Sequence, residues 1–589
     1  MASHPDAALP RPQDAALAVG RRRLKLVAVL FAMAFASIAL RLVDMVEWQE
    51  AARPAAVATL PAEQDETAPL SLGRADILDR NGVVLATTIR VPGVYADPSL
   101  LPDKSEAARR LAAILEGVDA GELAKRFAAS RRFAWVKHRI TPQEQEAVLE
   151  LGLPGVQFTA VEHRVYPKER LAAHVTGFVD IDNRGLAGVE RFLDRRLRDD
   201  ATPVQLGLDA RVQQVAREEL GRAIRRFHAI GGNAIVLDRV TGEVLAMVSL
   251  PDFDPNRVGD VRRIEYLNRN IGEVYELGSV FKILTIAMAL DSGKVSLSDR
   301  FDATGKLQIG RFRIGDDHAK NRVLSVPEIF QYSSNIGTAR MAFAAGGAAP
   351  LEHFFRQLGF YDPPRIEIAE VVRPRTPRRW ADVTVATTSF GHGFAVTPLQ
   401  FVDAVGGIIG DEGHVPATLL KREGAPPAPD ARFVRPQTAE AMRWLMWLAV
   451  EHGTGDQAKL PSYLIGGKTG TAEKPARGGY SHDRVLASFI GAFPIDKPRY
   501  LAFVALDEPQ GDAGTHGYRY GGWTAAPVVA AIIDRIGPLL NLPPTPPAVE
   551  MKMRERLERL MPDTSGTGGE IEPTPNRQEA HLAAGSALR

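Results

Sequence analysis

Three short polar motifs along this 589-residue chain constrain its fold more than any other feature does. They are Ser279-Val280-Phe281-Lys282, Ser333-Ser334-Asn335 and Lys468-Thr469-Gly470-Thr471. Each is ordinary by itself, because S-x-x-K arises by chance about once in a chain of this length and because Ser and Asn are common turn residues. They gain meaning only together and in this order, within a single large domain.

The first motif pairs a nucleophile with a base. Ser279 and Lys282 are three positions apart, so on a helix they share a face and the amine can take the hydroxyl proton. A lysine acts as a base only if burial or a neighbouring cation lowers its pKa. Gly278 suits a helix start, where backbone N–H groups favour developing negative charge. The alternative interpretation is an amphipathic helix with one surface lysine.

The other two motifs supply polar groups for a substrate. The Ser333 hydroxyl and the Asn335 amide can point to the same side, where they could relay a proton and hold a substrate amide. Residues 468–471 are predicted to form an edge strand along which a substrate strand can lie. Lys468 would serve a carboxylate or the Ser333 hydroxyl, and Gly470 would allow close backbone approach. The alternatives are simple turn residues and a Gly-rich turn before a strand.

In this order, S-x-x-K, S-x-N and K-T-G are the signature of penicillin-binding transpeptidases and serine β-lactamases. The sequence around Ser279 resembles that of class B penicillin-binding proteins. Further motifs of that class are Arg74–Gly82, in which Ala75 departs slightly from the usual Gly, Arg164–Pro167 with Ala173–Gly177, and Gly185–Glu190. The division-specific FtsI type is most similar, through Ser389–Gly393, Val396–Gln400, and Asp507–Gln510 followed by Gly521-Gly522. The resemblance covers about residues 20–540.

The resemblance implies a role for each site residue. Ser279 is expected to attack the D-Ala–D-Ala bond of a stem peptide, and an amine of a neighbouring stem then takes the acyl group. β-Lactams would stall at the acyl-enzyme. The implied assignments are Lys282 as base, Ser333, Asn335 and Lys468 in proton transfer and substrate holding, and Thr469, Gly470 and Thr471 as the substrate-facing strand. The N–H groups of Ser279 and Thr471 would form the oxyanion hole.

His392 has two interpretations. By analogy it is a polar residue beside the site, and the alternative is a structural loop histidine. No H-E-x-x-H pattern or Asp/His cluster occurs, so we predict neither a metal nor a cofactor. The absence of cysteine excludes a disulfide framework, a thiolate nucleophile and cysteine zinc sites.

The chain is predicted to have an α+β fold: an antiparallel sheet covered by helices, preceded by a smaller α+β pedestal domain and one transmembrane helix. The predicted segments are a cytoplasmic tail (1–23), the anchor (24–46), a linker (47–70), the pedestal domain (71–200), the transpeptidase domain (201–541) and a disordered tail (542–589). Hydrophobic patterns predict pedestal strands at 83–88 and 155–161, with helices at 105–115 and 142–151. In the larger domain they predict helices at 210–227, 279–292 and 524–536, a hairpin of 233–238 and 244–249, and strands at 485–493 and 500–506. A charged helical patch is expected at 551–561.

The anchor prediction rests on a basic cluster, Arg21–Lys25, followed by the apolar run Leu26–Leu40. That run reaches spanning length only if Arg41 snorkels and the helix continues to Val46. The basic cluster should stay cytoplasmic, which places the catalytic domain in the periplasm at the inner membrane. A cleaved signal peptide and a buried core helix are the alternatives.

The formal net charge of +1 gives no indication of nucleic acid binding. The expected partners are peptidoglycan stem peptides, β-lactams as inhibitors, the membrane, and, from the family, the septal glycosyltransferase and other division proteins at the septum. Alternatives are an elongation-type class B transpeptidase, a β-lactam-hydrolysing or β-lactam-sensing relative, and an inactive scaffold.

Overall fold

The computed structural model describes residue 33 and residues 73–259, 262–476 and 479–560. Apart from Met33, the predicted tail, anchor and linker (1–70) lie outside these residues. Among the described residues, no helix is both long and apolar enough to cross a bilayer.

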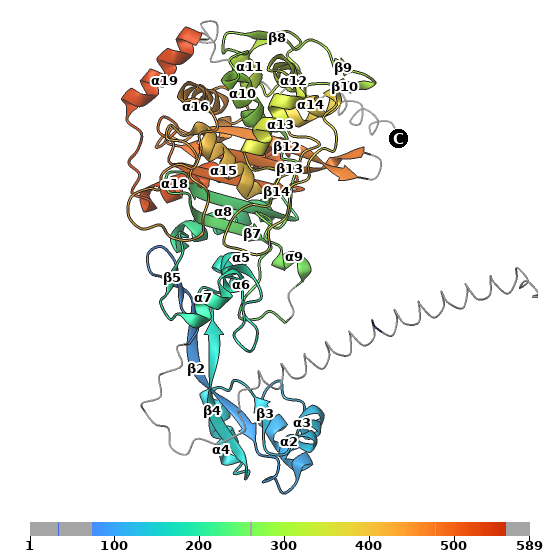
Figure 1. Cartoon of the computed structure of the whole chain (residues 1–589), viewed down its shortest axis with the longest axis vertical. Helices are drawn as coiled ribbons and strands as arrows, with labels where there is room; N and C mark the ends of the chain where they lie inside the picture. The colour runs from blue at the N-terminus through green and yellow to red at the C-terminus, as the bar shows by residue number, and fades with distance from the viewer. Residues whose placement is uncertain (1–32, 34–72, 260–261, 477–478, 561–589) are drawn as a thin grey trace, which may run out of the picture. The chain divides into compact units, whose positions relative to one another are not determined.

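A five-stranded antiparallel sheet forms the centre of the larger domain (Figure 1). Its order is β12 (Gly466–Ala476), β13 (Gly479–Phe493), β14 (Tyr500–Asp507), β6 (Gly231–Asp238) and β7 (Glu243–Leu250). The predicted hairpin and the two later strands are confirmed, although β13 begins earlier than predicted. β12 is an edge strand, so within the described part of the chain one side of the K-T-G segment has no strand partner.

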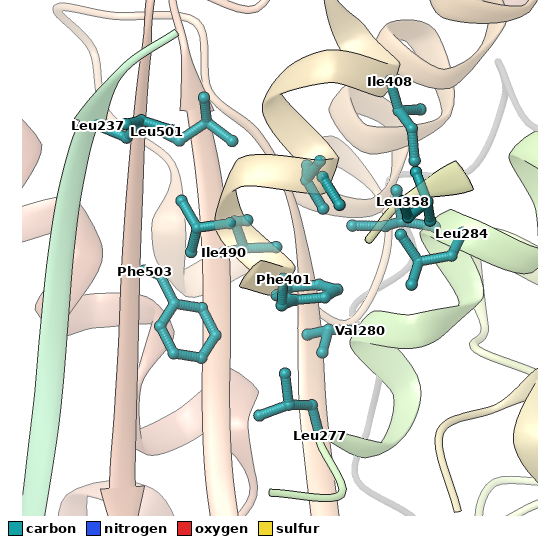
Figure 2. Close-up of a cluster of buried hydrophobic side chains, with 14 of the residues drawn as sticks. Leu237, Leu277, Val280, Leu284, Leu358, Phe401, Ile408, Ile490, Leu501 and Phe503 are labelled. Atoms are coloured by element: carbon teal, nitrogen blue, oxygen red, sulfur yellow. The ribbon is translucent and has the colours of Figure 1, made fainter. Parts of the chain in front are cut away.

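Both faces of this sheet are buried. Successive side chains point to opposite faces, so neighbouring residues of a strand enter different cores. Ile235, Leu237 and Phe503 face one core, whereas Val236 and Val504 face another. Figure 2 shows the first core, where side chains of the sheet meet those of the segments that carry the first motif. Burial on both faces explains why β6, β7 and β14 are largely apolar in sequence.

Helices cover the two faces. The S-x-x-K face carries 3₁₀-helix η2 (Gly278–Phe281), α10 (Lys282–Asp291), α11 (Val326–Gln331), α12 (Asn335–Ala344), α13 (Ala348–Gln357), α14 (Asp382–Ser389), α15 (Pro398–Ile409) and α16 (Pro436–Glu451). The opposite face carries α8 (Ala210–Arg226) and α18 (Ala526–Leu539). Short elements complete the domain: α9 (Arg263–Tyr266), η3 (Asp456–Ala458), η4 (Ala513–Thr515), α17 (Gly521–Thr524), and the pairs β8 (Arg300–Asp302) with β11 (Val323–Ser325) and β9 (Leu307–Ile309) with β10 (Phe312–Ile314). The predicted helices at 210–227, 279–292 and 524–536 are confirmed, the second beginning as η2 and the third as α17.

The pedestal region has a second sheet. It contains β1 (Ile77–Leu78), β2 (Val84–Ala96), β3 (Ala134–Lys137), β4 (Val156–Val165) and β5 (Val204–Gln205), all antiparallel except the parallel pair β1–β5. Helices α2 (Lys104–Ile114), α3 (Ala120–Ala129) and α4 (Pro142–Glu150) enclose a separate small core with it. Short helices η1 (Glu169–Ala172), α5 (Ala173–Thr176), α6 (Gly188–Phe192) and α7 (Asp194–Asp199) follow.

Strands β2 and β4 run past their predicted ends at Thr88 and Val161. Pro92 stays in β2, and its carbonyl accepts the Ile140 N–H at 3.0 Å. At Gly93 a Cβ atom would lie 2.8 Å from the His138 carbonyl oxygen and 2.7 Å from a Val161 methyl group. Pro92 and Gly93 are residue types that usually interrupt strands, but here they stay within β2, and Gly93 allows the close approach of another backbone segment.

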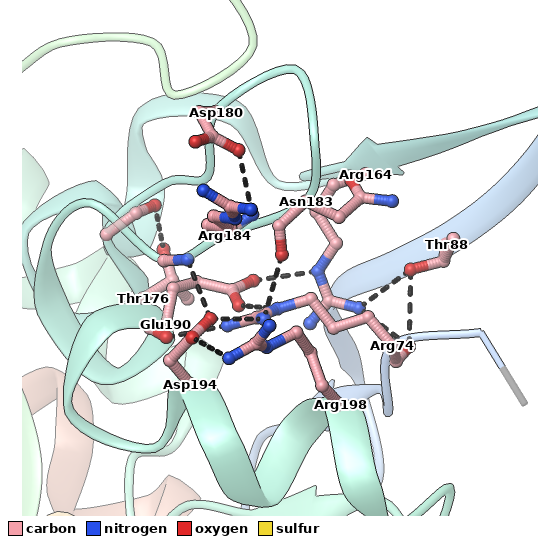
Figure 3. Close-up of polar contacts among 12 residues, drawn as sticks. Arg74, Thr88, Arg164, Thr176, Asp180, Asn183, Arg184, Glu190, Asp194 and Arg198 are labelled. Atoms are coloured by element: carbon pink, nitrogen blue, oxygen red, sulfur yellow. Dashed lines mark hydrogen bonds and ion pairs between the residues drawn. The ribbon is translucent and has the colours of Figure 1, made fainter. Parts of the chain in front are cut away.

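The pedestal motifs of the sequence converge on a buried ion cluster (Figure 3). Glu190 accepts from Arg74 Nε at 2.5 Å and from Arg164 Nε at 2.7 Å, and all three side chains are at most 1% exposed. Asp194 adds a partly buried carboxylate at 2.7 Å from Arg74 Nη1. Three segments far apart in sequence are thus joined by mutually neutralised charges.

The Arg74–Gly82 motif also contacts the larger domain. The buried Asp79 carboxylate accepts the Val83 N–H at 2.8 Å and the Ala210 N–H at 3.0 Å. Asn81 donates to Asp209, the N-cap of α8, at 3.0 Å. This motif therefore connects the pedestal to the first helix of the transpeptidase region.

The prediction of a disordered tail from residue 542 is wrong for its first part. Pro547–Leu560 form helix α19, in agreement with the charged helical patch expected there. Arg554 pairs with Glu451 at 2.7 Å and Arg556 with Glu440 at 2.6 Å, both on α16. The charges that resemble a disordered composition instead pair with a neighbouring helix.

Candidate active site

Ser279 lies at the start of the helix that carries the first motif. Gly278 adopts φ +61°, and a Cβ there would lie 2.5 Å from the Thr471 carbonyl oxygen, so glycine permits η2 to touch β12. Val280 and Leu284, four positions apart, pack into the core in Figure 2. This packing leaves Ser279 partly exposed, next to the edge strand.

Lys282 is completely buried beneath Ser279. Its Nζ atom lies 2.9 Å from Ser279 Oγ, 2.7 Å from Asn335 Oδ1, 2.5 Å from the Ser333 carbonyl oxygen and 3.0 Å from Ser333 Oγ. The carbonyl and the amide oxygen can only accept, so they orient two of the amine protons. The remaining direction faces the hydroxyl groups, as a base requires.

Burial lowers the pKa of Lys282 to about 8, against the opposing effect of the negative charges of Asp317 and Asp316. The neutral amine is therefore accessible near physiological pH. A neutral Lys282 can donate to its two fixed acceptors and still accept the Ser279 proton.

Ser333 lies in the connection between α11 and α12, with φ +58°. This left-handed conformation is uncommon for serine and must be held by its surroundings. Its hydroxyl lies between two amines, 3.0 Å from Lys282 Nζ and 2.9 Å from Lys468 Nζ. The second and third motifs therefore meet the first at a single oxygen atom.

The K-T-G segment lies on edge strand β12, as predicted. Lys468 is fully buried and donates to Ser333, which matches the second of the two roles considered for it. At Gly470 a Cβ would lie 2.6 Å from the Leu277 carbonyl oxygen, so glycine allows η2 to approach. The Thr469 hydroxyl pairs with that of Thr454 at 2.7 Å, and Thr471 is partly exposed and accepts the Gly521 N–H at 3.2 Å.

Burial and the neighbouring Lys282 charge lower the pKa of Lys468 well below its usual range. Two amines that share one hydroxyl in a buried site resist being charged together. The arrangement can thus pass a proton from Ser279 through Lys282 and Ser333, beside a strand edge that can hold an extended peptide.

Two protein families match this chain. A family model described as the penicillin-binding protein transpeptidase domain matches residues 232–534, and one described as the penicillin-binding protein dimerisation domain matches residues 70–237. The chain belongs to the class B penicillin-binding proteins. The resemblance recognised from the motifs is confirmed at the level of the family.

Individual relatives of this class B penicillin-binding protein agree. The probable peptidoglycan D,D-transpeptidase FtsI of Caulobacter vibrioides is 40% identical over 482 residues, covering 80% of this chain and 82% of that protein. The probable peptidoglycan D,D-transpeptidase PenA of Neisseria meningitidis is 33% identical over 517 residues, 82% and 87% of the two chains. The crystal structure of apo penicillin-binding protein 3 from Mycobacterium tuberculosis aligns with a TM-score of 0.62 and 26% identity, covering 81% and 98% of the two chains.

His392 lies in the loop packed against Gly278, whose N–H donates to the Gly391 carbonyl at 3.3 Å. Its ring contacts Tyr480 edge to face at 5.5 Å, and burial lowers its pKa, which favours the neutral form. Within the described part of the chain its Nδ1 atom has no hydrogen-bond partner. The histidine is therefore beside the site in this class B penicillin-binding protein, as the analogy suggested, and its role stays a prediction.

The motifs did not reveal Thr454 or Asp316. Thr454 follows α16 and bonds to Thr469. Asp316 lies in the connection after β10 and binds Ser334. Neither residue belongs to a recognisable motif, and only the folded chain brings them to the catalytic segments.

Proposed function

We propose that this protein is a peptidoglycan D,D-transpeptidase that cross-links stem peptides during septal wall synthesis, with Ser279 as the residue that carries the acyl group. One observation carries the proposal: the buried Lys282 amine lies 2.9 Å from Ser279 Oγ, with its pKa lowered by burial. The septal assignment is supported by the FtsI name of the Caulobacter relative.

In the first step, Ser279 Oγ attacks the carbonyl carbon of the penultimate D-alanine while Lys282 takes the hydroxyl proton. The N–H groups of Ser279 and Thr471 stabilise the resulting oxyanion. The proton then passes through the Ser333 hydroxyl to the leaving nitrogen, and Lys468 and Asn335 hold that hydroxyl and the substrate amide. The C–N bond breaks and D-alanine leaves, with the stem peptide esterified to Ser279.

In the second step, the amine of a neighbouring stem attacks the ester carbonyl. The amine loses a proton through the same relay, and the proton returns to Ser279 as the ester breaks. The donor peptide lies as an extra strand along β12, with residues 469–471 as its contact. A β-lactam follows the first step only, because its ring-opened product keeps the leaving nitrogen attached.

The test is to incubate the detergent-solubilised full chain with a labelled penicillin and follow the label on the protein over time. A stable label that is missing in Ser279→Ala supports the transpeptidase. Rapid turnover of the drug would instead assign the protein to the β-lactam-hydrolysing class. If the wild-type protein takes no label at all, both assignments fail.

The pH dependence of acylation follows from the state of Lys282. Only the neutral amine can accept the Ser279 proton, and the pKa is about 8. We expect the acylation rate to rise about tenfold per pH unit below that value and to level off above it. Stopped-time labelling between pH 6 and 10 with a penicillin stable over this range, at about 25 °C, measures the profile. A rate that is flat below pH 8 would remove Lys282 from the role of base.

We also propose the membrane topology predicted from the N-terminal sequence, with residues 24–46 as an uncleaved anchor and the catalytic domain in the periplasm at the septum. The support is the basic cluster Arg21–Lys25 followed by the apolar run to Val46. A septal glycosyltransferase and other division proteins are the expected partners. Alkaline extraction of membranes tests the anchor, since release of the full chain into the supernatant would contradict it.

A further inference from the structure

Asp316 binds the first turn of the helix that follows Ser333. Its Oδ2 atom accepts from the Ser334 hydroxyl at 2.6 Å, and its Oδ1 atom accepts the Ile336 N–H at 2.9 Å. Ser334 is the N-cap of α12, and its hydroxyl in turn accepts the Gly337 N–H at 2.9 Å. One carboxylate therefore holds both the N-cap side chain and a free N–H of the helix start, where a negative charge is favourable.

The neighbouring Gly315 carbonyl fixes the direction of the Asn335 amide. It accepts Asn335 Nδ2 at 3.1 Å, which turns Oδ1 of the same amide toward Lys282 Nζ at 2.7 Å. Gly315 and Asp316 together contact three consecutive residues, Ser334 to Ile336. The segment is itself held by Ile314, which is buried in a small core with side chains of α12 and α14.

The position of Ser333 depends on both flanking helices as well as on the two amines that its oxygen atoms contact. Its φ of +58° is an uncommon conformation for serine, and Ser333 is the single residue between Tyr332, the C-cap of α11, and Ser334, the N-cap of α12. The Ser333 N–H donates to the Phe330 carbonyl at 3.3 Å and the Ser334 N–H to the Ile329 carbonyl at 3.0 Å, so α11 holds the backbone of the turn from its N-terminal side. On the α12 side, Asp316 holds the same turn through the Ser334 hydroxyl and the Ile336 N–H.

We propose that Asp316 is a positioning residue for the acylation step, which holds the Ser333 hydroxyl and the Asn335 amide against Lys282 through its hydrogen bonds to Ser334 and Ile336. The proposal rests on the proposed function of the site. Asp316 does not touch the substrate. It acts by keeping the turn between α11 and α12 in the conformation that the proton relay needs.

Asp317 provides a matched control. It is the neighbouring carboxylate and is exposed, and among the described residues the α12 start bonds to Asp316 and not to Asp317. Both Asp316 and Asp317 act on Lys282 through their charge, in the same direction. Asp316→Ala and Asp317→Ala therefore share the loss of one charge, and they differ in the loss of the hydrogen bonds.

The experiment measures the acylation rate by a labelled penicillin for the full chain and for these variants, across pH. The charged and titratable groups around Lys282 are Lys468, Asp316, Asp317 and the neutral His392. Loss of either carboxylate shifts the rising limb to lower pH. We expect only Asp316→Ala to lower the high-pH plateau, by about 100-fold, the scale of a small misplacement of catalytic groups.

A double-mutant cycle with Ser334→Ala tests the route. If Asp316 acts through Ser334, the double variant should lose less than the product of the two single losses. Asp316→Asn, which keeps an acceptor for the Ile336 N–H, should fall between the wild type and Asp316→Ala. If Asp316→Ala does not fold, Asp316→Asn and Ser334→Ala decide the question by the same plateau measurement.

A plateau for Asp316→Ala within about twofold of that for Asp317→Ala overturns the proposal, and so does a cycle in which the losses multiply. Failure of the site assignment is a separate result, because the wild type itself would then take no label.

Discussion

Lys282→Ala should lower the rate of acylation with labelled penicillin roughly 10²–10⁴-fold, which is the range expected when a general base is removed. The variant removes the amine that lies 2.9 Å from Ser279 Oγ and leaves the Asn335 amide oxygen and the Ser333 carbonyl without their shared donor. Lys468 cannot take over directly, since its hydrogen bond goes to Ser333. The measurement is the rate at which label becomes covalently attached at pH 8.

The control is Lys497→Ala, which removes an exposed lysine from the same domain and should label at the wild-type rate. Thermal unfolding of both variants shows whether the loss reflects misfolding. Near-normal labelling of a folded Lys282→Ala protein would refute its role as the base and leave the serine to another proton acceptor.

Glu190→Ala should destabilise the pedestal by about 3–5 kcal/mol, the usual cost of removing one partner from a buried ion cluster. Two guanidinium groups, Arg74 and Arg164, would remain buried and lose the carboxylate they share. Some pedestal residues, such as Ile77 and Val189, belong to the same hydrophobic core as the transpeptidase helices. The loss should therefore reach beyond the pedestal itself. Urea unfolding followed by far-UV circular dichroism and limited proteolysis measures it.

Glu122→Ala is the matched control. Glu122 also pairs with a cation, Lys125 at 3.0 Å, but both side chains are largely exposed. Such a surface pair contributes about 0–1 kcal/mol, so the unfolding midpoint should hardly move. Equal midpoints for Glu190→Ala and the wild type would mean that the buried cluster contributes no net stability.

Hydrophobic patterns in the sequence correctly predicted the helices and strands whose apolar side chains pack into a core. The hairpin of β6 and β7, the strands β13 and β14, and helix α8 follow from residue type and period, because their side chains enter well-filled cores. The same reasoning ended β2 too early at Thr88. Only the crossing of Gly93 with the His138 backbone shows why Pro92 and Gly93 remain in a strand.

The docking of helix α19 could not be predicted for a related reason, although a charged helical patch is expected at 551–561. Its charged residues have no apolar period strong enough to predict a docked helix, and its ion pairs with Glu451 and Glu440 join segments about 100 residues apart. Long-range charge pairing leaves no local pattern in the sequence.

By itself, the sequence determined which chemical groups this protein can use and the family to which it belongs, because residue identity and motif order are local properties. Only the tertiary structure decided the distances between those groups, their burial and their pKa values. Burial lowers the pKa of Lys282, the α11–α12 turn holds Ser333 at positive φ, and Lys468 reaches the same hydroxyl from an edge strand. Proton affinity and hydrogen-bond distance depend on dielectric surroundings and on neighbours that are far away in the chain. Asp316 belongs to no motif, and only the folding of the chain brings it to the site.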